Sequence, residues 1–180
     1  MSDSICFCLR GGMVDTRDLK SLGLIGRAGS SPAEGAGLLK SDIILDGDIP
    51  HISLKPHPWR PLKTSGSQRN IPLVGASLWA AQRLSEAFPD SPYAFPRYNR
   101  KDITNSNSAS AALNKWLHHY VPHGCTMHSF RHSMRDRLRA VECPSDIIDQ
   151  IGGWAFTDVG KKYGQGYDLK VCNIWFQKIS

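Results

Sequence analysis

The sequence predicts a mostly helical α+β domain with one small antiparallel sheet. Three observations support this class: apolar residues recur with helical spacing over most of the chain, β-branched residues concentrate between Ile43 and Leu73, and clusters of Gly, Pro and Ser separate the segments. A chain of 180 residues can bury a substantial core as one domain. Residues 1–12 show no clear period, so we expect a weakly ordered entry segment followed by a domain over 13–180.

The N-terminal part predicts two helices. Val14, Leu19, Leu22 and Ile25 recur at roughly helical spacing and predict a helix over 14–25. A cluster of Gly, Ser and Pro follows and should end it. A second helix is expected over 33–39, with Ser31 as its N-cap and a proline in its first turn.

The segment 43–73 is expected to form the sheet. Asp46 and Gly47 supply turn chemistry between its first two strands, and Pro50 argues that the second strand lies at an edge. The strands are expected over 43–45, 49–54 and 69–73, with a hairpin tip at 63–67. Later helices are expected over 75–88, 106–120, 129–140 and 145–151, with a loop rich in Pro and aromatic residues over 89–100.

The charge balance favours an anionic partner. Lys and Arg number 22 against 16 Asp and Glu, a formal net charge of +6, which fits nucleic acid but is also common among proteins without such a partner. Four arginines lie within nine residues from Arg131 to Arg139. This run is consistent with a solvated helix face or with a helix that faces a DNA duplex.

The cysteines indicate reduced thiols rather than a metal site. The five cysteines form no CxxC pair and no Cys/His cluster with zinc spacing, so we expect no metal. An odd count with no secretory signal points to the cytoplasm. The apolar segment 5–9 is far too short for a signal core or a membrane span.

One constellation suits phosphodiester chemistry. His128 and Arg131 lie three residues apart, Trp154 follows 23 residues later, and Tyr163 nine residues after that. Arg131 can bind non-bridging phosphate oxygens, His128 and the Trp154 indole can donate hydrogen bonds to them, and Tyr163 can be a nucleophile. Taken singly, each residue would more often be an ordinary packing or surface residue, and Tyr167 is a rival to Tyr163.

The order and spacing of these residues resemble the C-terminal catalytic half of the tyrosine recombinases, the phage integrase family. The resemblance covers about residues 20–175 and implies a DNA strand transferase that needs neither ATP nor a metal. Tyr163 would form a 3′-phosphotyrosyl link, and Lys63, at the expected hairpin tip before a strand of the family's pattern, would protonate the leaving 5′ oxygen. We expect further DNA contacts from Arg60, Arg69, Arg135 and Lys161.

The family's first catalytic arginine is missing. Its position falls on Ser31, and Arg27 is the nearest substitute. Loss of one preorganised donor to transition-state charge lowers a rate by roughly a hundred- to a thousand-fold. We therefore expect impaired cleavage.

The resemblance also implies partners. Family members act on double-stranded DNA as tetramers on paired sites, often exchanging a C-terminal segment; residues 169–179 would be that segment or would fold back on their own core. The family's N-terminal DNA-clamping domain is expected to be absent. Three alternatives remain: a catalytically dead DNA-binding remnant, a helix-turn-helix regulator built on 129–151, and a type IB topoisomerase, which fits the expected hairpin less well.

Overall fold

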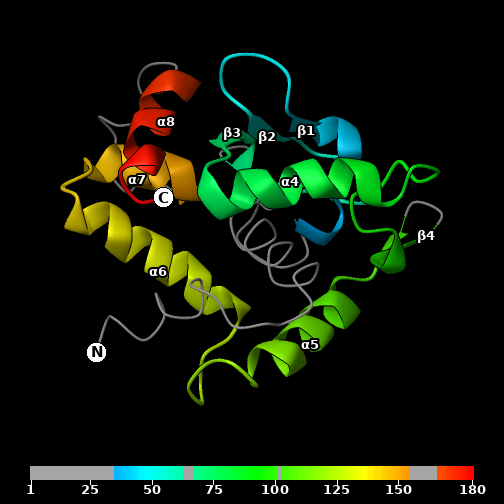
Figure 1. Ribbon diagram of the computed structural model, residues 1–180. Helices are drawn as coiled ribbons and strands as arrows, with labels where there is room; N and C mark the ends of the chain where they lie inside the picture. Colours follow the sequence, from blue (N-terminus) through cyan, green and yellow to red (C-terminus); the bar gives the residue numbers. More distant parts are fainter. Residues whose placement is uncertain (1–34, 63–66, 101–102, 155–165) are drawn as a thin grey trace.

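The computed structural model describes residues 35–62, 67–100, 103–154 and 166–180 (Figure 1). The described part is a mixed helical and sheet structure with five α-helices, a three-stranded antiparallel sheet and a two-stranded one. The mixed class agrees with the sequence prediction. The helix expected over 14–25 and the entry segment 1–12 lie outside the described residues, as does most of the expected hairpin tip.

The three-stranded sheet consists of β1 (Ile43–Ile44), β2 (His51–Leu54) and β3 (Arg69–Pro72), in the order β1-β2-β3. Ile52 at its centre pairs with both outer strands. The expectation of an edge strand after Pro50 was wrong, because β2 is the central strand. Pro50 precedes the first paired residue, so the ladder loses no donor there, and its carbonyl accepts a hydrogen bond from the backbone N–H of Leu73 at 2.8 Å.

The helix expected over 33–39 does not extend that far. Residues 35–36 are helical, but Leu39 forms an isolated β-bridge with Tyr93 and a 3₁₀ turn, η1 (Lys40–Asp42), follows. The backbone there pairs with the distant segment 92–94 instead of with itself. The segment 89–100, which was expected to be a loop, thus supplies backbone hydrogen-bond partners to Leu38 and Lys40. It also contains a 3₁₀ turn, η3 (Pro96–Tyr98), and strand β4 (Asn99–Arg100), which pairs with β5 (Ile103–Thr104); neither strand was predicted.

Four helices lie close to their predicted positions: α4 (Gly75–Ala87), α5 (Ser106–Leu117), α6 (Met127–Ala140) and α7 (Ser145–Gly152). Helix α6 begins two residues before its expected start because Thr126 caps it. The Thr126 hydroxyl accepts from the His128 N–H at 3.3 Å, and the Ser129 hydroxyl accepts from the Thr126 N–H at 3.0 Å. His128 therefore lies in the first helical turn.

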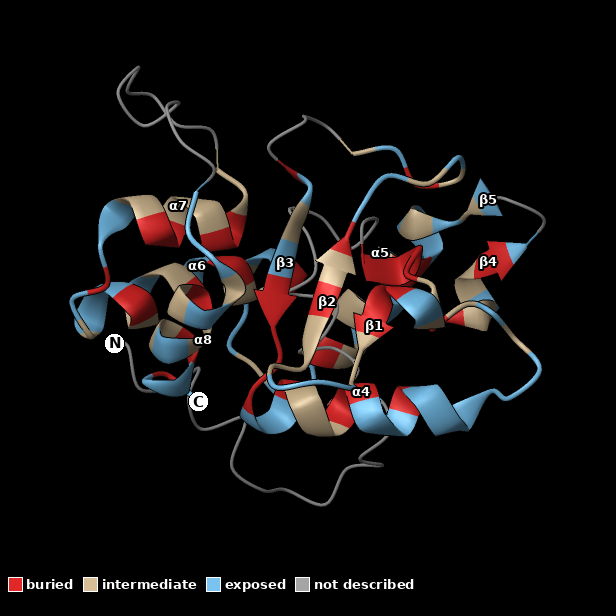
Figure 2. Cartoon of the chain, turned by 90° about the horizontal axis from the view of Figure 1, so that it is seen from above, coloured by how far each residue is buried: buried red, intermediate tan, exposed pale blue. Residues whose placement is uncertain are grey.

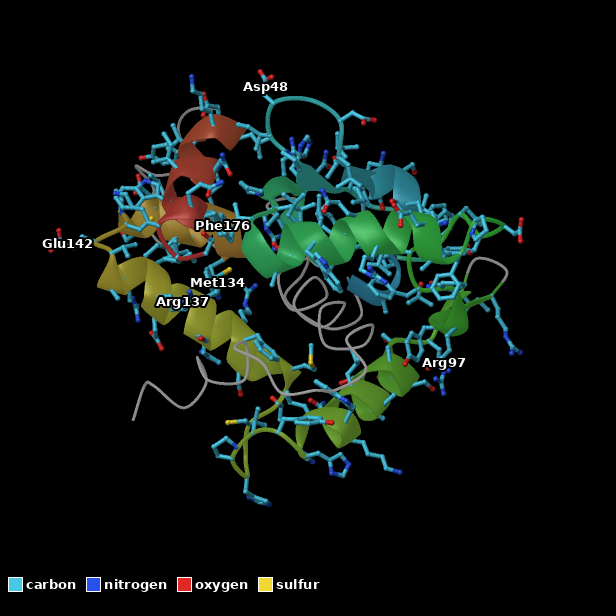
Figure 3. All side chains as sticks on the ribbon, in the orientation of Figure 1. Asp48, Arg97, Met134, Arg137, Glu142 and Phe176 are labelled. Carbon is cyan, nitrogen blue, oxygen red and sulfur yellow. The ribbon has the colours of Figure 1, made fainter. Side chains whose placement is uncertain are left out.

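The last helix, α8 (Leu169–Gln177), packs on the chain's own core. Its N-cap is Asp168, whose carboxylate accepts from the Val171 N–H at 2.8 Å. Cys172 and Phe176 on this helix are buried. Phe176 and Met134 of α6 belong to the same core cluster (Figure 3). Within the described residues, no helix combines the length and apolarity needed to cross a membrane.

Two core clusters organise the described part. Figure 2 shows that helices α6, α7 and α8 gather beside β3, whereas α5 and the β4–β5 pair lie on the side of β1. We call the cluster on the side of β1 the sheet cluster and the cluster among α6, α7 and α8 the helical cluster. The sheet cluster is Leu38, Ile43, Ile52, Leu54, Leu73, Ala81, Leu84, Ala94, Phe95, Leu117 and Met127. The helical cluster is Ile71, Val74, Met134, Leu138, Cys143, Ile147, Ile148, Ile151, Cys172, Phe176 and Ile179.

Candidate functional site

Helix α6 carries three of the expected site residues. His128, Arg131 and Arg135 are spaced by three and four residues, so they share one face of the helix. His128 is exposed and its ring meets that of His132 edge-on, with the centroids 4.8 Å apart. Arg131 is only 7 % exposed. The face thus presents an exposed imidazole beside a largely buried guanidinium.

Trp154 joins this face from the end of α7. The Cζ atom of Arg131 lies 4.1 Å from the centroid of the indole, and that of Arg135 lies 4.6 Å from it. Both distances are within the range of cation–π attraction. Arg131 and Trp154, 23 residues apart in sequence, are therefore in direct contact.

The two glycines before Trp154 explain how the indole reaches α6. Helix α7 ends in a Schellman motif: Gly153 has φ +64, its N–H binds the Gln150 carbonyl at 3.1 Å, and the Trp154 N–H binds the Asp149 carbonyl at 2.9 Å. The indole then folds back over Gly152. A Cβ on Gly152 would lie 1.8 Å from an atom of the ring, so only glycine leaves room for it.

Arg69 lies against the same turn but has a structural role. Its Nε donates to the Ile151 carbonyl at 3.0 Å and its Nη1 to the Ser67 carbonyl at 2.7 Å. A guanidinium is favourable at the C-terminal end of a helix, where carbonyls are left over. A Cβ on Gly153 would lie 2.4 Å from Arg69 Nη1. This geometry ties β3 to the end of α7 and does not favour the DNA contact expected of Arg69.

Arg60 likewise points inward. Its side chain is buried, and its Nη2 donates to Asp42 Oδ2 at 3.0 Å and to the Lys55 carbonyl at 2.9 Å. Asp42 is wholly buried and also binds His57 Nε2 at 3.0 Å, with Lys55 Nζ 3.6 Å away. We call Asp42, Lys55, His57 and Arg60 the Asp42 hub. A DNA phosphate cannot reach a guanidinium placed this way, so the expected DNA contact of Arg60 is not favoured either.

Tyr167, the rival nucleophile, is held by α7. Its hydroxyl donates to Asp146, and this hydrogen bond is the main cause that raises the pKa of Tyr167 above its usual value; desolvation and the charge of Asp146 add to the effect. Its backbone is bound by Gln150, which accepts from the Tyr167 N–H at 2.7 Å and donates to its carbonyl at 2.6 Å. A raised pKa leaves less phenolate at neutral pH, which disfavours Tyr167 as a nucleophile.

Five of the expected site residues lie outside the described residues: Tyr163, Lys63, Lys161, Ser31 and Arg27. The structure therefore brings together Arg131, Arg135 and Trp154, with His128 on the same helix face. Sequence reasoning missed Asp42 and Asp149 as partners of arginines. An acidic residue has no local pattern that reveals a partner 14 or 18 residues away.

Among the described residues, no group of three or more His, Cys, Asp or Glu side chains is arranged to hold a metal ion. No protein-family model matches this chain, and neither a curated protein nor a solved structure matches it. The function is therefore inferred from the residues and their geometry.

Proposed function

We propose that this chain is the catalytic domain of a tyrosine-type site-specific DNA recombinase. The observation that carries the proposal is the contact between Arg131 and Trp154, at 4.1 Å. Two motif positions meet there, one on α6 and one just after the end of α7, and His128 lies one turn before Arg131. A guanidinium held against an aromatic ring keeps its charge, and the geometry of a guanidinium matches that of phosphate oxygens.

The proposed reaction is a transesterification. The Tyr163 hydroxyl oxygen attacks the scissile phosphorus and its proton passes to His128, while the bond to the 5′ oxygen breaks and Lys63 supplies the proton for that oxygen. Arg131 and His128 stabilise the charge on the non-bridging oxygens. The phosphoester energy stays in the 3′-phosphotyrosyl link, so a 5′ hydroxyl of a partner strand can reverse the step. The protein would act on double-stranded DNA, as a tetramer on paired sites, in a bacterial or phage-derived cytoplasmic setting.

Covalent capture tests the proposal. A pool of nicked duplexes with randomised sequence is incubated with the protein, and DNA linked to protein is isolated after denaturation. We expect slow adduct formation in the natural sequence and a gain of about a hundredfold in Ser31→Arg, which restores the second arginine. Tyr163→Phe should abolish the adduct, and the matched variant Tyr167→Phe should retain it. Adduct formation by Tyr163→Phe, or its absence from Ser31→Arg, contradicts the proposal.

Ser31 favours a second candidate, a DNA-binding protein of the same fold without cleavage activity. Such a protein would bind duplexes with a steep salt dependence, because lysine and arginine release counterions from phosphates. It would form no adduct in the natural sequence or in Ser31→Arg. Salt-dependent binding with no adduct in either protein supports this second candidate.

A further inference from the structure

Asp149 on α7 holds two residues of the candidate site at once. Its backbone carbonyl accepts the Trp154 N–H at 2.9 Å, and its carboxylate Oδ1 accepts from Arg135 Nη2 at 3.2 Å. The carboxylate is 16 % exposed and the Arg135 side chain 33 % exposed. Asp149 therefore binds both the backbone N–H of Trp154 and the guanidinium of Arg135 on the neighbouring helix.

The Arg135 guanidinium completes a closed set of contacts. Its Cζ lies 4.6 Å from the centroid of the Trp154 indole, and Arg131 contacts the same ring. Arg131 and Arg135 are one helical turn apart, so their like charges repel. The Asp149 carboxylate reduces that repulsion, and the polarisable indole attracts both cations.

We infer that Arg135 and Asp149 form a positioning pair that holds the Trp154 ring against the Arg131 guanidinium. The inference rests on the proposed function for its purpose, but its geometry is independent of that function. It assigns Arg135 a role through Trp154 instead of the direct DNA contact that the sequence had suggested. A planar guanidinium suits this role because it can stack on the indole and bind a carboxylate at the same time.

The first experiment reads the Arg131 side chain directly. The indole ring current displaces the Nε–Hε signal of Arg131 in a ¹H–¹⁵N spectrum, and Arg131→Lys assigns that signal. We expect Arg135→Met and Asp149→Asn to move the signal toward the position of an unstacked arginine, and Trp154→Leu should do the same. The matched control is Arg139→Met, which removes an exposed arginine of the same helix that pairs with its neighbour Asp136 at 3.6 Å; it should leave the signal in place.

Arg135→Lys is a milder variant that separates a loss of positioning from a loss of folding, since lysine keeps the charge but lacks the planar guanidinium. It should shift the Arg131 signal while the thermal unfolding midpoint remains close to that of the natural sequence. An Arg131 signal that stays unchanged in Arg135→Lys and Asp149→Asn overturns the inference.

The second experiment separates positioning from a direct DNA contact. Affinity for a 20-base-pair duplex is measured for Arg135→Met in the natural background and in Arg131→Met. Positioning predicts a loss of about tenfold in the first background and about twofold or less in the second, because contacting residues are coupled. Arg139→Met should lose the same factor in both backgrounds. Equal losses for Arg135→Met in both backgrounds would assign it a direct contact and overturn the inference. If the natural sequence binds no duplex, the proposed function fails while the spectrum still decides whether the positioning pair exists.

Discussion

Two arginines of similar burial define two different regions of this molecule. Arg60, 3 % exposed, belongs to the Asp42 hub beside the sheet cluster, whereas Arg131, 7 % exposed, lies on the face of Trp154 beside the helical cluster. Arg60 binds a buried carboxylate and a backbone carbonyl through its N–H groups. The Cζ atom of Arg131 lies 4.1 Å from the centroid of the Trp154 indole.

The difference shows how the surroundings of a cation decide its use. A carboxylate engages the N–H donors of a guanidinium and compensates its charge, so the Asp42 hub serves to fix the loop after β2. An aromatic face attracts the cation through its quadrupole and does not neutralise its charge. The Asp42 hub therefore holds a loop through charge compensation, whereas Arg131 is held against an aromatic ring, an arrangement that fits the anionic partner in the proposed function.

Breaking the Asp42 hub should give the largest effect. Asp42→Ala leaves a guanidinium buried without its carboxylate, and such a change costs about 3–5 kcal/mol of the free energy of unfolding. Urea denaturation followed by circular dichroism measures it.

The matched control for the hub is Asp136→Ala. Asp136 pairs with Arg139 across one helical turn, and both side chains are more than half exposed. Its removal should change the unfolding free energy by about 0.5 kcal/mol or less. Equal losses for the two variants would show that the Asp42 hub is not the structural element described above.

Gly152 provides a sharper test of the Arg131 region. Glycine to alanine within a helix ordinarily stabilises by about 0.5–1 kcal/mol. At Gly152 the added Cβ would meet the Trp154 ring at 1.8 Å, so we expect Gly152→Ala to destabilise by about 1–3 kcal/mol, as overpacking does. In Trp154→Leu the clash is removed, and the same substitution should become neutral or stabilising. An unfavourable Gly152→Ala in both backgrounds would contradict the fold of the indole over α7.

The two regions also differ in how far the sequence predicted them. The helical spacing of apolar residues placed α4 to α7 to within a few residues, and the motif named both Arg131 and Trp154, which the structure places in contact. The Asp42 hub was not predicted, nor were the inward positions of Arg60 and Arg69. A sequence shows that an arginine is charged, but its role depends on the carboxylate or carbonyl that the fold brings to it. The bridge between Leu39 and Tyr93 was not predicted for the same reason: a partner 54 residues away in the sequence ends the expected helix.

The two helices beside the candidate site end in the same motif with different residues. Helix α7 uses Gly153, whereas α6 uses Glu142 at φ 60, the one described non-glycine residue with a positive φ (Figure 3). The Glu142 N–H binds the Arg139 carbonyl at 2.9 Å and the Cys143 N–H binds the Leu138 carbonyl at 3.0 Å. Glu142→Gly should therefore raise the unfolding free energy by about 1 kcal/mol, because glycine adopts this conformation without a Cβ penalty. Glu142→Ala, which keeps the Cβ, should give no such gain in the same urea titration; equal gains would point to the charge instead.

The smallest effect concerns the thiols beneath the Arg131 region. Burial raises the pKa of Cys143 and of Cys172 to about 11, with smaller contributions from neighbouring anionic groups. At pH 8 roughly one thiol in a thousand is then ionised, against about one in four for an ordinary cysteine. With Cys6 and Cys8 changed to serine, a disulfide reagent should modify Cys125 first, and Cys143 and Cys172 should react only on unfolding or as the pH approaches 11.

The same shifts have a consequence for stability. A thiol whose folded pKa lies above its unfolded value favours the folded state below the unfolded pKa and loses that contribution as the pH rises to the folded one. The unfolding free energy should thus fall between about pH 9 and pH 11, and less so in Cys143→Ala/Cys172→Ala. Modification of Cys143 or Cys172 at pH 8 as fast as Cys125 would mean that water enters the helical cluster. In that case the surroundings of Arg131 would be wetter than those of Arg60, and the comparison would rest on access to solvent as well as on the partner of each cation.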